Sequence, residues 1–388
     1  MRPFLYGVFC LAAVLAPFSR PVYPAAGAEG HDKYLIHIGT YTGPNSKGIY
    51  AYRYDARSGK VEAIGLAAEM IRPSFLAVHP NQRFLYAVSE LGNDGKQDGS
   101  ITAFAIDRSS GMLTKLNTVT SGGGGACHLV VDKTGKALVA ANYGSGSVAA
   151  FVVNPDGTLR GPTAVIKHSG SSVDQSRQRG PHAHAVVLSP DNRFVFVPDL
   201  GLDQIRIYRL DAPNGALTPN DPPFVATKPG AGPRHFAFSP SGRFAYSLHE
   251  MGSMVTVWAY TPSSGGLTEV QTISTLPADF TGKNNSAEIE VDAKGKFLYA
   301  SNRGHDSIAV FAIEPRTGRL TLVEHVPTKG RTPRNFKIDP SGRYLFAANQ
   351  DTNNIVVFRI DLRTGGLTPT GQVLGVQSPV CVQFTPAG

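Results

Sequence analysis

Four ionisable side chains lie at the two ends of one short stretch of this sequence, residues 232–250. Both halves alternate apolar residues around a Ser-Pro-Ser-Gly turn, and this pattern predicts a tight β-hairpin. The start of the first strand should lie beside the end of the second. The residues that would meet there are Arg234, His235, His249 and Glu250. Guanidinium groups bind carboxylate or phosphate, and a Glu or a neutral His can move a proton, so this set suits attack of water on the carbonyl of a compact anion.

Other copies of this hairpin bring further polar side chains to the same rim. Aligning the copies on their turns gives one column at the start of the first strand and another at the end of the second. The further candidates in or beside these columns are Glu90, His128, His182, His184, Asp199, Glu288, Asn302, Arg303, Arg334, Asn335, Asn349 and Gln350. Four of the column residues are the hardest to explain by packing between blades: Arg234, Glu250, Glu288 and Arg303. For any single position, the competing interpretation is a solvated channel lining or a hydrogen bond between blades.

The hairpin is part of a unit that occurs seven times. Its second strand starts at Tyr34, Phe84, Ala137, Phe194, Phe244, Phe297 and Tyr344, with spacings of 47 to 57 residues. Each copy continues into a third apolar strand and then a fourth, more polar one. This organisation predicts an all-β fold, a seven-bladed β-propeller with four antiparallel strands per blade and almost no helix. The short, apolar first strands should lie next to the central axis, with the ionisable rim at the channel mouth.

The two ends of the chain indicate how the ring closes. No first-strand motif precedes Tyr34, but a further copy occupies residues 378–386. The C-terminal strand should therefore complete the first blade, which removes an open sheet edge.

Several other chemistries have little support. There is no Gly-x-Ser-x-Gly motif, so an acyl-serine route is not expected. The glycine run 122–125 lacks the Lys-Ser/Thr of a phosphate loop, and we interpret it as a flexible connection between blades. Rim carboxylates could hold calcium, but the arginines beside them argue against a cation. Cys127 and Cys381 have no metal-ligand spacing and should be buried, unpaired thiols. We therefore expect no metal and no cofactor.

The net charge of +8 comes from Lys and Arg that are spread over turns and strand edges. There is no basic tract or basic helix, so nucleic acid is not an expected partner. The arginines that recur in the turns are expected to be structural and to lie on the opposite rim: Arg83, Arg193, Arg243 and Arg343. His37 and His79 are interpreted as packing residues.

The N-terminus resembles a secretory signal. Arg2 precedes an apolar run over residues 4–18, and a small-residue stretch around Gly27 follows. We predict a signal peptide over residues 1–28 and one propeller domain over residues 29–388, exported to the periplasm or secreted. A retained N-terminal anchor is the alternative. No second long apolar run occurs, so no membrane span is expected in the mature chain.

Several of these segments resemble the seven-bladed propeller lactonases, which include 6-phosphogluconolactonases and carboxymuconate lactonising enzymes. The segments are Gly-Pro-Arg-His at 232–235 through Glu250, Asn-Asn-Ser-Ala-Glu at 284–288 through 307, and Thr-Pro-Arg-Asn at 332–335 through 351. Gly-Pro-His-Ala-His at 180–184 is similar to the family's histidine motif, with Ala183 where proline is common. Glu288 stands where the family often has Asp.

The resemblance implies metal-independent lactone chemistry with one His, two Arg and one Glu. These roles carry over to His182 or His184, Arg234, Arg303 and Glu250. We hypothesise that the two arginines anchor the lactone, Glu250 activates water, and His184, or less readily His182, protonates the leaving ring oxygen. The residues expected to contact substrate are Glu90, His128, His235, Glu288, Arg334, Asn335 and Gln350. The expected partner is a small anionic lactone, most simply 6-phosphogluconolactone hydrolysed to 6-phosphogluconate by a monomer or weak homodimer. The pentose phosphate pathway, in which the family usually acts, is cytoplasmic. The export signal therefore makes a periplasmic sugar lactone, phosphorylated or not, a serious variant. The alternative is a non-catalytic exported propeller that binds a ligand or partner protein at this rim.

Overall fold

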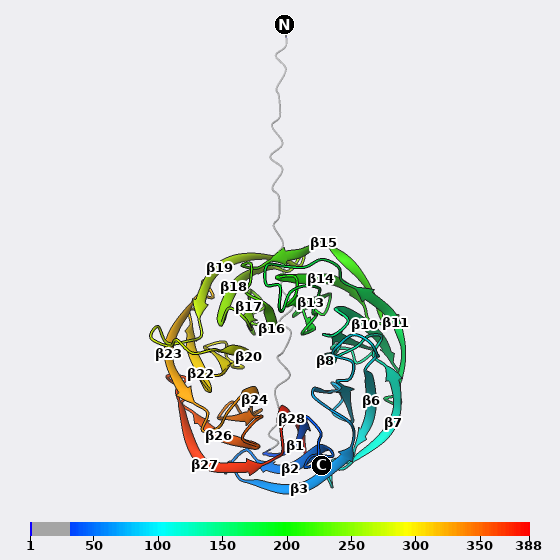
Figure 1. The fold of residues 1–388 in the computed structure, drawn as a ribbon, viewed down its shortest axis with the longest axis vertical. Helices are drawn as coiled ribbons and strands as arrows, with labels where there is room; N and C mark the ends of the chain where they lie inside the picture. Colours follow the sequence, from blue (N-terminus) through cyan, green and yellow to red (C-terminus); the bar gives the residue numbers. More distant parts are fainter. Residues whose placement is uncertain (2–31) are drawn as a thin grey trace. The chain divides into compact units, whose positions relative to one another are not determined.

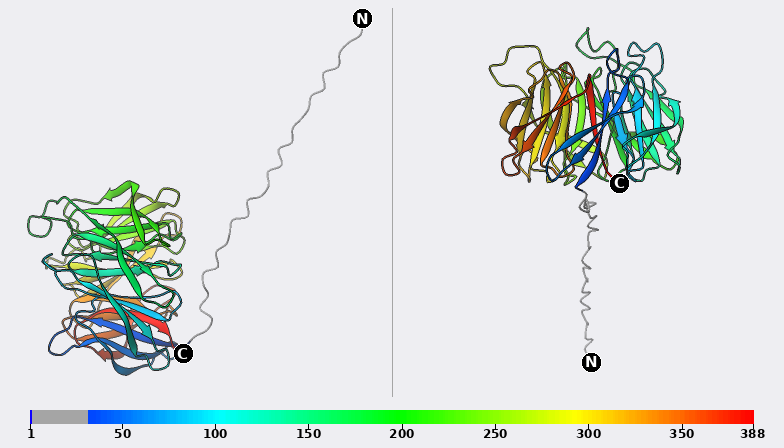
Figure 2. Two further views of the ribbon diagram at one scale, coloured as in Figure 1. Left: turned by 90° about the vertical axis from the view of Figure 1, so that its right-hand side faces the viewer. Right: turned by 90° about the horizontal axis from the view of Figure 1, so that it is seen from below.

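The computed structural model describes residue 1 and residues 32–388. In residues 32–388, seven four-stranded antiparallel sheets surround a central channel (Figure 1). The strands run between the two faces of the ring (Figure 2), and no helix occurs in this part of the chain. The predicted seven-bladed propeller is therefore confirmed. The predicted signal peptide, apart from Met1, lies outside the described residues.

Each blade contributes four strands, which follow one another from the channel outward. The first three blades are β28 (Pro379–Pro386), β1 (Lys33–Thr40), β2 (Gly48–Asp55), β3 (Val61–Glu69); β4 (Leu76–Val78), β5 (Phe84–Ser89), β6 (Ser100–Ile106), β7 (Leu113–Thr120); and β8 (Ala126–Val131), β9 (Ala137–Asn142), β10 (Ser147–Val153), β11 (Leu159–Lys167). The next two are β12 (Val187–Leu188), β13 (Phe194–Asp199), β14 (Gln204–Asp211), β15 (Ala216–Ala226); and β16 (Pro233–Phe238), β17 (Phe244–His249), β18 (Met254–Thr261), β19 (Gly266–Ser274). The last two are β20 (Asn285–Val291), β21 (Phe297–Arg303), β22 (Ser307–Ile313), β23 (Leu320–Pro327); and β24 (Pro333–Ile338), β25 (Tyr344–Asn349), β26 (Asn354–Ile360), β27 (Leu367–Gly375).

The hydrophobic core lies between neighbouring blades. Second strands such as β5 and β9 are buried at every position, because both faces of each sheet pack against another sheet. Tyr86 on β5, for example, shares a cluster with Phe151 on β10 of the next blade. Its hydroxyl donates to the carbonyl of Gly157 at 3.0 Å, so the polar end of a buried ring is also satisfied. The outermost strands, such as β7, are largely exposed or half-buried.

The C-terminal strand closes the ring as predicted. β28 pairs with β1 from Tyr34↔Pro386 to Thr40↔Pro379, and these strands share one sheet with β2 and β3. Arg108 of the second blade also holds the end of the chain, because its Nε donates to the carbonyl of Pro386 at 2.9 Å. Both chain ends therefore depend on one another for a complete first blade.

The residues expected to be structural have structural partners. The turn arginines Arg243 and Arg343 donate to backbone carbonyls of neighbouring blades, at Arg316 and Ala56. The rings of His37 and His79 bond the carbonyls of Gly111 and Gly135. Both Cys127 and Cys381 are free and buried, as predicted.

The glycine run 122–125 connects β7 to β8, but the prediction that it is flexible was wrong. Gly123, Gly124 and Gly125 are buried. A Cβ at Gly124 would lie 2.3 Å from the carbonyl oxygen of Gly92, and Gly125 has a φ of +70°. The run is glycine-rich because two turns approach it closely and because its backbone conformation disfavours a side chain.

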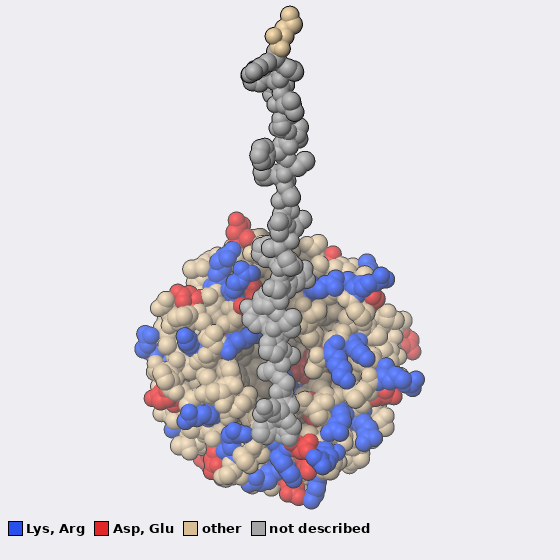
Figure 3. Space-filling view, turned by 180° about the vertical axis from the view of Figure 1, so that it is seen from behind, with Lys and Arg blue, Asp and Glu red and all other residues tan. Residues whose placement is uncertain are grey.

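The surface of the ring carries charges of both signs. Lys and Arg are scattered over the face seen in Figure 3, and Asp and Glu lie among them. Within residues 32–388, no helix is long and apolar enough to cross a membrane.

Candidate active site

A repeated irregularity at the start of the first strands aims side chains at the channel mouth. In β16 the pairing with β17 jumps from Pro233↔His249 to His235↔Leu248, so Arg234 is an extra, bulged residue. The same jump makes Arg334 the bulged residue of β24. A bulge re-aims a side chain that regular alternation would send elsewhere. As a result Arg334 reaches the mouth of the channel, whereas Arg234 lies beside His235 in the layer below it.

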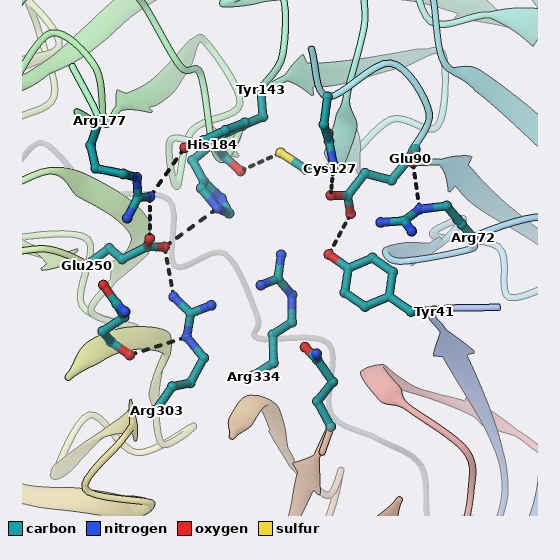
Figure 4. A pocket seen from close by; sticks show the side chains of 13 residues that line it. Tyr41, Arg72, Glu90, Cys127, Tyr143, Arg177, His184, Glu250, Arg303 and Arg334 are labelled. Carbon is teal, nitrogen blue, oxygen red and sulfur yellow. Dashed lines mark hydrogen bonds and ion pairs between the residues drawn. The ribbon is translucent and has the colours of Figure 1, made fainter. Parts of the chain in front are cut away.

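The channel mouth forms a cavity of about 600 Å³. Figure 4 shows its lining side chains converging from several blades. The lining residues are Tyr41, Arg72, Glu90, Asn93, Cys127, Tyr143, Arg177, His184, Glu250, Asn285, Arg303, Arg334 and Gln350. We call this the outer cavity.

Three guanidinium groups surround the carboxylate of Glu250, which follows the end of β17. Arg177 donates to Oε1 at 2.7 Å, and Arg303 and Arg234 donate to Oε2 at 2.8 and 3.1 Å. Burial alone would raise the pKa of Glu250, but the charges of Arg303 and Arg234 and the hydrogen bond from Arg177 outweigh it. The pKa of Glu250 is therefore held well below its usual range, and the side chain is a permanent anion.

His184 lies beside this carboxylate. Its Nε2 is 4.0 Å from Glu250 Oε2, and its buried Nδ1 has no hydrogen-bond partner among the described residues. The Cys127 thiol donates to the backbone carbonyl of His184 at 3.3 Å. Burial, and then the positive charge of Arg234, lowers the pKa of His184 well below its usual value. The imidazole is therefore neutral near pH 7.

Arg334 differs from the other arginines of the outer cavity. Within residues 32–388 its guanidinium makes no hydrogen bond or ion pair with another side chain or carbonyl; it lies 5.2 Å from the centre of the Tyr41 ring. Figure 4 shows it pointing into the open centre of the cavity. Five N–H donors are thus available to a ligand.

Glu90 forms the opposite wall from Glu250. Tyr41 donates its hydroxyl to Glu90 Oε2 at 2.9 Å, and Asn93 donates to Oε1 at 3.1 Å. Arg72 donates to the backbone carbonyl of Glu90 at 2.9 Å and lies over the Tyr41 ring. This wall offers hydroxyl, amide and carboxylate groups, the types that bind sugar hydroxyls.

A deeper layer separates the outer cavity from a second one of about 300 Å³. Here His235 Nδ1 bonds Glu288 Oε1 at 2.7 Å, and Asn335 donates to Glu288 Oε2 at 2.5 Å. His128 stacks on Phe75, with ring centres 4.0 Å apart. Glu288, Asn335 and His128 line this inner cavity. Both carboxylate oxygens of Glu288 thus have side-chain partners within this layer.

The family description "Lactonase, 7-bladed beta-propeller" matches residues 35–384. The chain belongs to this lactonase family. A 6-phosphogluconolactonase of Bacillus subtilis (strain 168) is 39% identical over 304 residues, which cover 78% of this chain and 84% of that protein. A 6-phosphogluconolactonase of Formosa agariphila is 36% identical over 312 residues, covering 78% and 85%.

Solved structures agree with this assignment. The periplasmic gluconolactonase of Pseudomonas aeruginosa has a TM-score of 0.86 at 37% identity, over 92% of this chain and 100% of that chain. A protein of Lactobacillus plantarum has a TM-score of 0.84 at 34% identity, over 91% and 99%. The protein is thus a hydrolase of the lactonase type.

The lactonase brings only part of the predicted set together at the outer cavity. The predicted residues that line it are Glu90, His184, Glu250, Arg303, Arg334 and Gln350. Arg234 reaches Glu250 from the layer below, beside His235. His182 lines neither cavity: its ring stacks on Tyr143 at 4.4 Å, and its Nδ1 bonds the carbonyl of Tyr143 at 2.9 Å.

Four residues expected beside the rim are buried within the blades instead. They are Asp199, His249, Asn302 and Asn349, each with no exposed surface. Successive side chains of a strand point to opposite sides. The last residue of the second strand therefore turns into its blade when the next residue, such as Glu250, faces the cavity.

Sequence reasoning missed Tyr41, Arg72, Asn93, Arg177 and Asn285 at the outer cavity. The first four lie in connections between strands, outside the repeated columns, and Asn285 is the first residue of β20. The segment between β11 and β12 is unusually long for this repeat, and that length is the one signal that could have drawn attention to Arg177. Within the described part of the chain, no group of three or more His, Cys, Asp or Glu is arranged to hold a metal ion.

Proposed function

We propose that this lactonase hydrolyses a sugar lactone by general acid and base catalysis without a metal ion. The first candidate reaction converts 6-phosphogluconolactone to 6-phosphogluconate, since two relatives carry the name 6-phosphogluconolactonase. One juxtaposition carries the proposal: the carboxylate of Glu250 and the neutral imidazole of His184 line the same cavity as Arg334, which makes no hydrogen bond or ion pair within residues 32–388.

In the attack step, His184 takes a proton from water as the water oxygen bonds the lactone carbonyl carbon. The carbonyl oxygen becomes an oxyanion, to which Arg334 donates hydrogen bonds. The C–O bond of the ring then breaks. Protonated His184 returns its proton to the ring oxygen, which becomes a hydroxyl of the opened chain. The same product molecule carries the new carboxylic acid, which ionises in water.

Glu250 stays ionised throughout this proposal. Both carboxylate oxygens of Glu250 already accept hydrogen bonds from guanidinium groups, whereas a ring nitrogen of His184 has no partner among the described residues. We therefore assign proton transfer to His184 and not to Glu250, the residue first expected to activate water. Its negative charge, 4.0 Å from His184 Nε2, would stabilise the imidazolium formed during attack. Arg234 and Arg303 then serve to hold Glu250 instead of anchoring the lactone.

Substrate binding should also adjust the base. The charge of Arg334 is among the causes that lower the pKa of His184. An anionic ligand or an oxyanion beside Arg334 offsets this charge, which makes His184 a stronger base when substrate is present. A phosphate on the substrate would face the half-buried Arg72 and Arg177.

The test compares Arg334→Gln with Arg331→Gln on freshly prepared 6-phosphogluconolactone and unphosphorylated gluconolactone, with chelator present. Arg331 is three residues away, and its side chain is exposed. Loss of an oxyanion donor costs roughly 10²–10³ in kcat, so we expect that loss for Arg334→Gln on whichever lactone is used and none for Arg331→Gln.

Wild-type turnover by Arg334→Gln would contradict the role of Arg334, and loss of wild-type activity in chelator would contradict the metal-free mechanism. If the protein hydrolyses none of several lactones faster than they hydrolyse spontaneously, the result would favour the alternative, a non-catalytic propeller that binds a ligand or partner protein.

We also propose that the protein is exported to the periplasm or secreted. The apolar run near the N-terminus and the periplasmic gluconolactonase neighbour support this. Fractionation of cells that express the full chain or residues 29–388 tests it, and equal cytoplasmic retention of both would contradict it.

A further inference from the structure

The blade that carries His184 departs from a pattern that three other blades share. Where the second strand ends, those blades have Asn142, Asn302 and Asn349. Each Asn donates its Nδ2 to the carbonyl of the residue that follows the outermost strand of the preceding blade: Ser121, Thr275 and Thr328. An asparagine at this position is therefore sufficient for the hydrogen bond that joins neighbouring blades.

The equivalent residue in the His184 blade is Asp199, and its partner is His168, which follows β11. His168 Nδ1 bonds Asp199 Oδ2 at 2.6 Å, and the hydroxyl of Tyr208 bonds His168 Nε2 at 2.8 Å. Neither the His168 nor the Asp199 side chain has exposed surface. With Nδ1–H donating to the carboxylate and Nε2 accepting from tyrosine, every polar atom of the imidazole has a partner.

Asp199 joins the two ends of the segment 168–182. Its Oδ2 holds His168 at the start of the segment, and its Oδ1 accepts the backbone N–H of His182 at 2.8 Å at the end. Oδ1 also accepts the backbone N–H groups of Gly201 and Leu202 at 3.1 and 3.2 Å. A single buried carboxylate thus fixes where this long connection leaves one blade and enters the next.

The segment matters to the outer cavity because of what it carries. Arg177, in its middle, bonds Glu250 and also lies 3.3 Å from the hydroxyl of Tyr143. His182, at its end, stacks on Tyr143, and Tyr143 in turn meets the edge of His184. Contacts therefore run without a break from Asp199 to both Arg177 and His184.

We propose that Asp199, His168 and Tyr208 form a positioning triad that sets Arg177 and His184 against Glu250. None of the three lines the outer cavity, so they act through the residues they hold. A buried carboxylate accepting four hydrogen bonds fixes its partners more tightly than the amide used in the other blades. The kinetic part of this inference rests on the proposed lactonase mechanism.

Two variants test the triad. The double variant Asp199→Asn with His168→Thr restores the Asn and Thr found together at Asn302 and Thr275, and at Asn349 and Thr328, so the blade keeps a bond that the fold already uses. Tyr208→Phe removes only the hydroxyl that bonds His168 Nε2. The control is Tyr54→Phe, since Tyr54 is also a buried tyrosine of a third strand and donates to a carboxylate, that of Asp339, at 3.0 Å.

The measurements are kcat and KM, melting temperature, and hydrogen exchange of peptides covering residues 168–184. Small misplacements of catalytic groups can cost up to about a hundredfold, so we expect kcat to fall at least tenfold in the double variant, with KM changed much less. Tyr208→Phe should show a smaller fall in the same direction, with faster exchange in residues 168–184. Tyr54→Phe should lose comparable melting temperature but keep wild-type kcat.

Equal kcat effects in Tyr208→Phe and Tyr54→Phe at equal loss of melting temperature would overturn the triad, because they would indicate a purely structural role. If the wild-type protein hydrolyses no lactone, the proposed mechanism fails, but hydrogen exchange still tests the triad. Unchanged protection of residues 168–184 in Tyr208→Phe would then overturn the triad as well. If the double variant does not fold, Tyr208→Phe carries the test.

Discussion

Glu250→Gln removes the charge that three guanidinium groups share. Arg177, Arg234 and Arg303 would remain around a neutral amide that is 6% exposed. Removing one partner of a buried ion pair costs about 3–5 kcal/mol, because the other charge is left uncompensated. Arg177 is 36% exposed and partly screened by solvent, so about 3 kcal/mol is the better figure. In domains of about 150–250 residues, a loss of 1 kcal/mol of stability lowers the melting temperature by about 2–4 °C. The melting temperature of Glu250→Gln should therefore fall by roughly 5–10 °C.

The same substitution should make the protein respond to anions. Three uncompensated guanidinium groups at an open cavity attract phosphate, whereas Glu250 occupies these donors in the wild type. Phosphate at 100 times its Kd adds about 2.7 kcal/mol, which would offset most of the loss. Turnover should still fall by about 10²-fold or more, because the imidazolium formed on His184 loses its counter-charge.

The assays are thermal unfolding in low-salt buffer with and without phosphate, and steady-state kinetics. Glu290→Gln is the matched control: Glu290 is a half-buried carboxylate paired with Lys337, and it lines the inner cavity. That variant should also lose stability, but its turnover and its phosphate response should match the wild type. Wild-type turnover by Glu250→Gln, or equal phosphate responses in the two variants, would refute the charge argument.

Three further outcomes follow from the same structure. Because burial, and then Arg234, lowers the pKa of His184 below 6.5, its neutral form persists on acidification, and kcat/KM should stay constant as pH falls through 6.5; a decline centred there would contradict the assignment. Deletion of residues 378–388 removes β28 and exposes the edge of β1, so most of the stability should be lost, and an unchanged melting temperature would argue against ring closure. Burial raises the pKa of Cys381 to about 12, so this thiol should not react with an aromatic disulfide reagent until the protein unfolds; rapid labelling of Cys381 in the native protein would disprove this.

The propeller could be predicted because its causes are local. Alternation of apolar residues and Pro-Ser-Gly turns recur along the chain, and the C-terminal copy supplies the strand that the first blade lacks. The columns of the repeat also identified Glu250, Arg303, Arg334 and His184, which the structure brings to one cavity. The columns did not show which residues lie at the channel mouth and which lie in the deeper layer. That depends on the bulges at Arg234 and Arg334, which arise from strand pairing and leave no pattern in the sequence.

Arg177 shows the limit of this reasoning. It lies 73 positions before Glu250, in a connection that belongs to no repeat, yet it donates to the same carboxylate as Arg234 and Arg303. Asp199 shows the same limit in reverse. It stands in a column position beside the rim but is buried, and there it bonds His168, which Tyr208 bonds in turn.

By itself, the sequence determined the all-β ring, the closure of its first blade and the set of polar residues from which a site could be built. Periodicity and turn chemistry act between neighbouring residues, so a linear pattern records them. Only the tertiary structure decided which charges neutralise one another. Three guanidinium groups from separate segments make Glu250 a permanent anion, while Arg334 is left open to a ligand. Charge state and pairing depend on burial and on distances through space, and these exist only once the blades have closed around the channel.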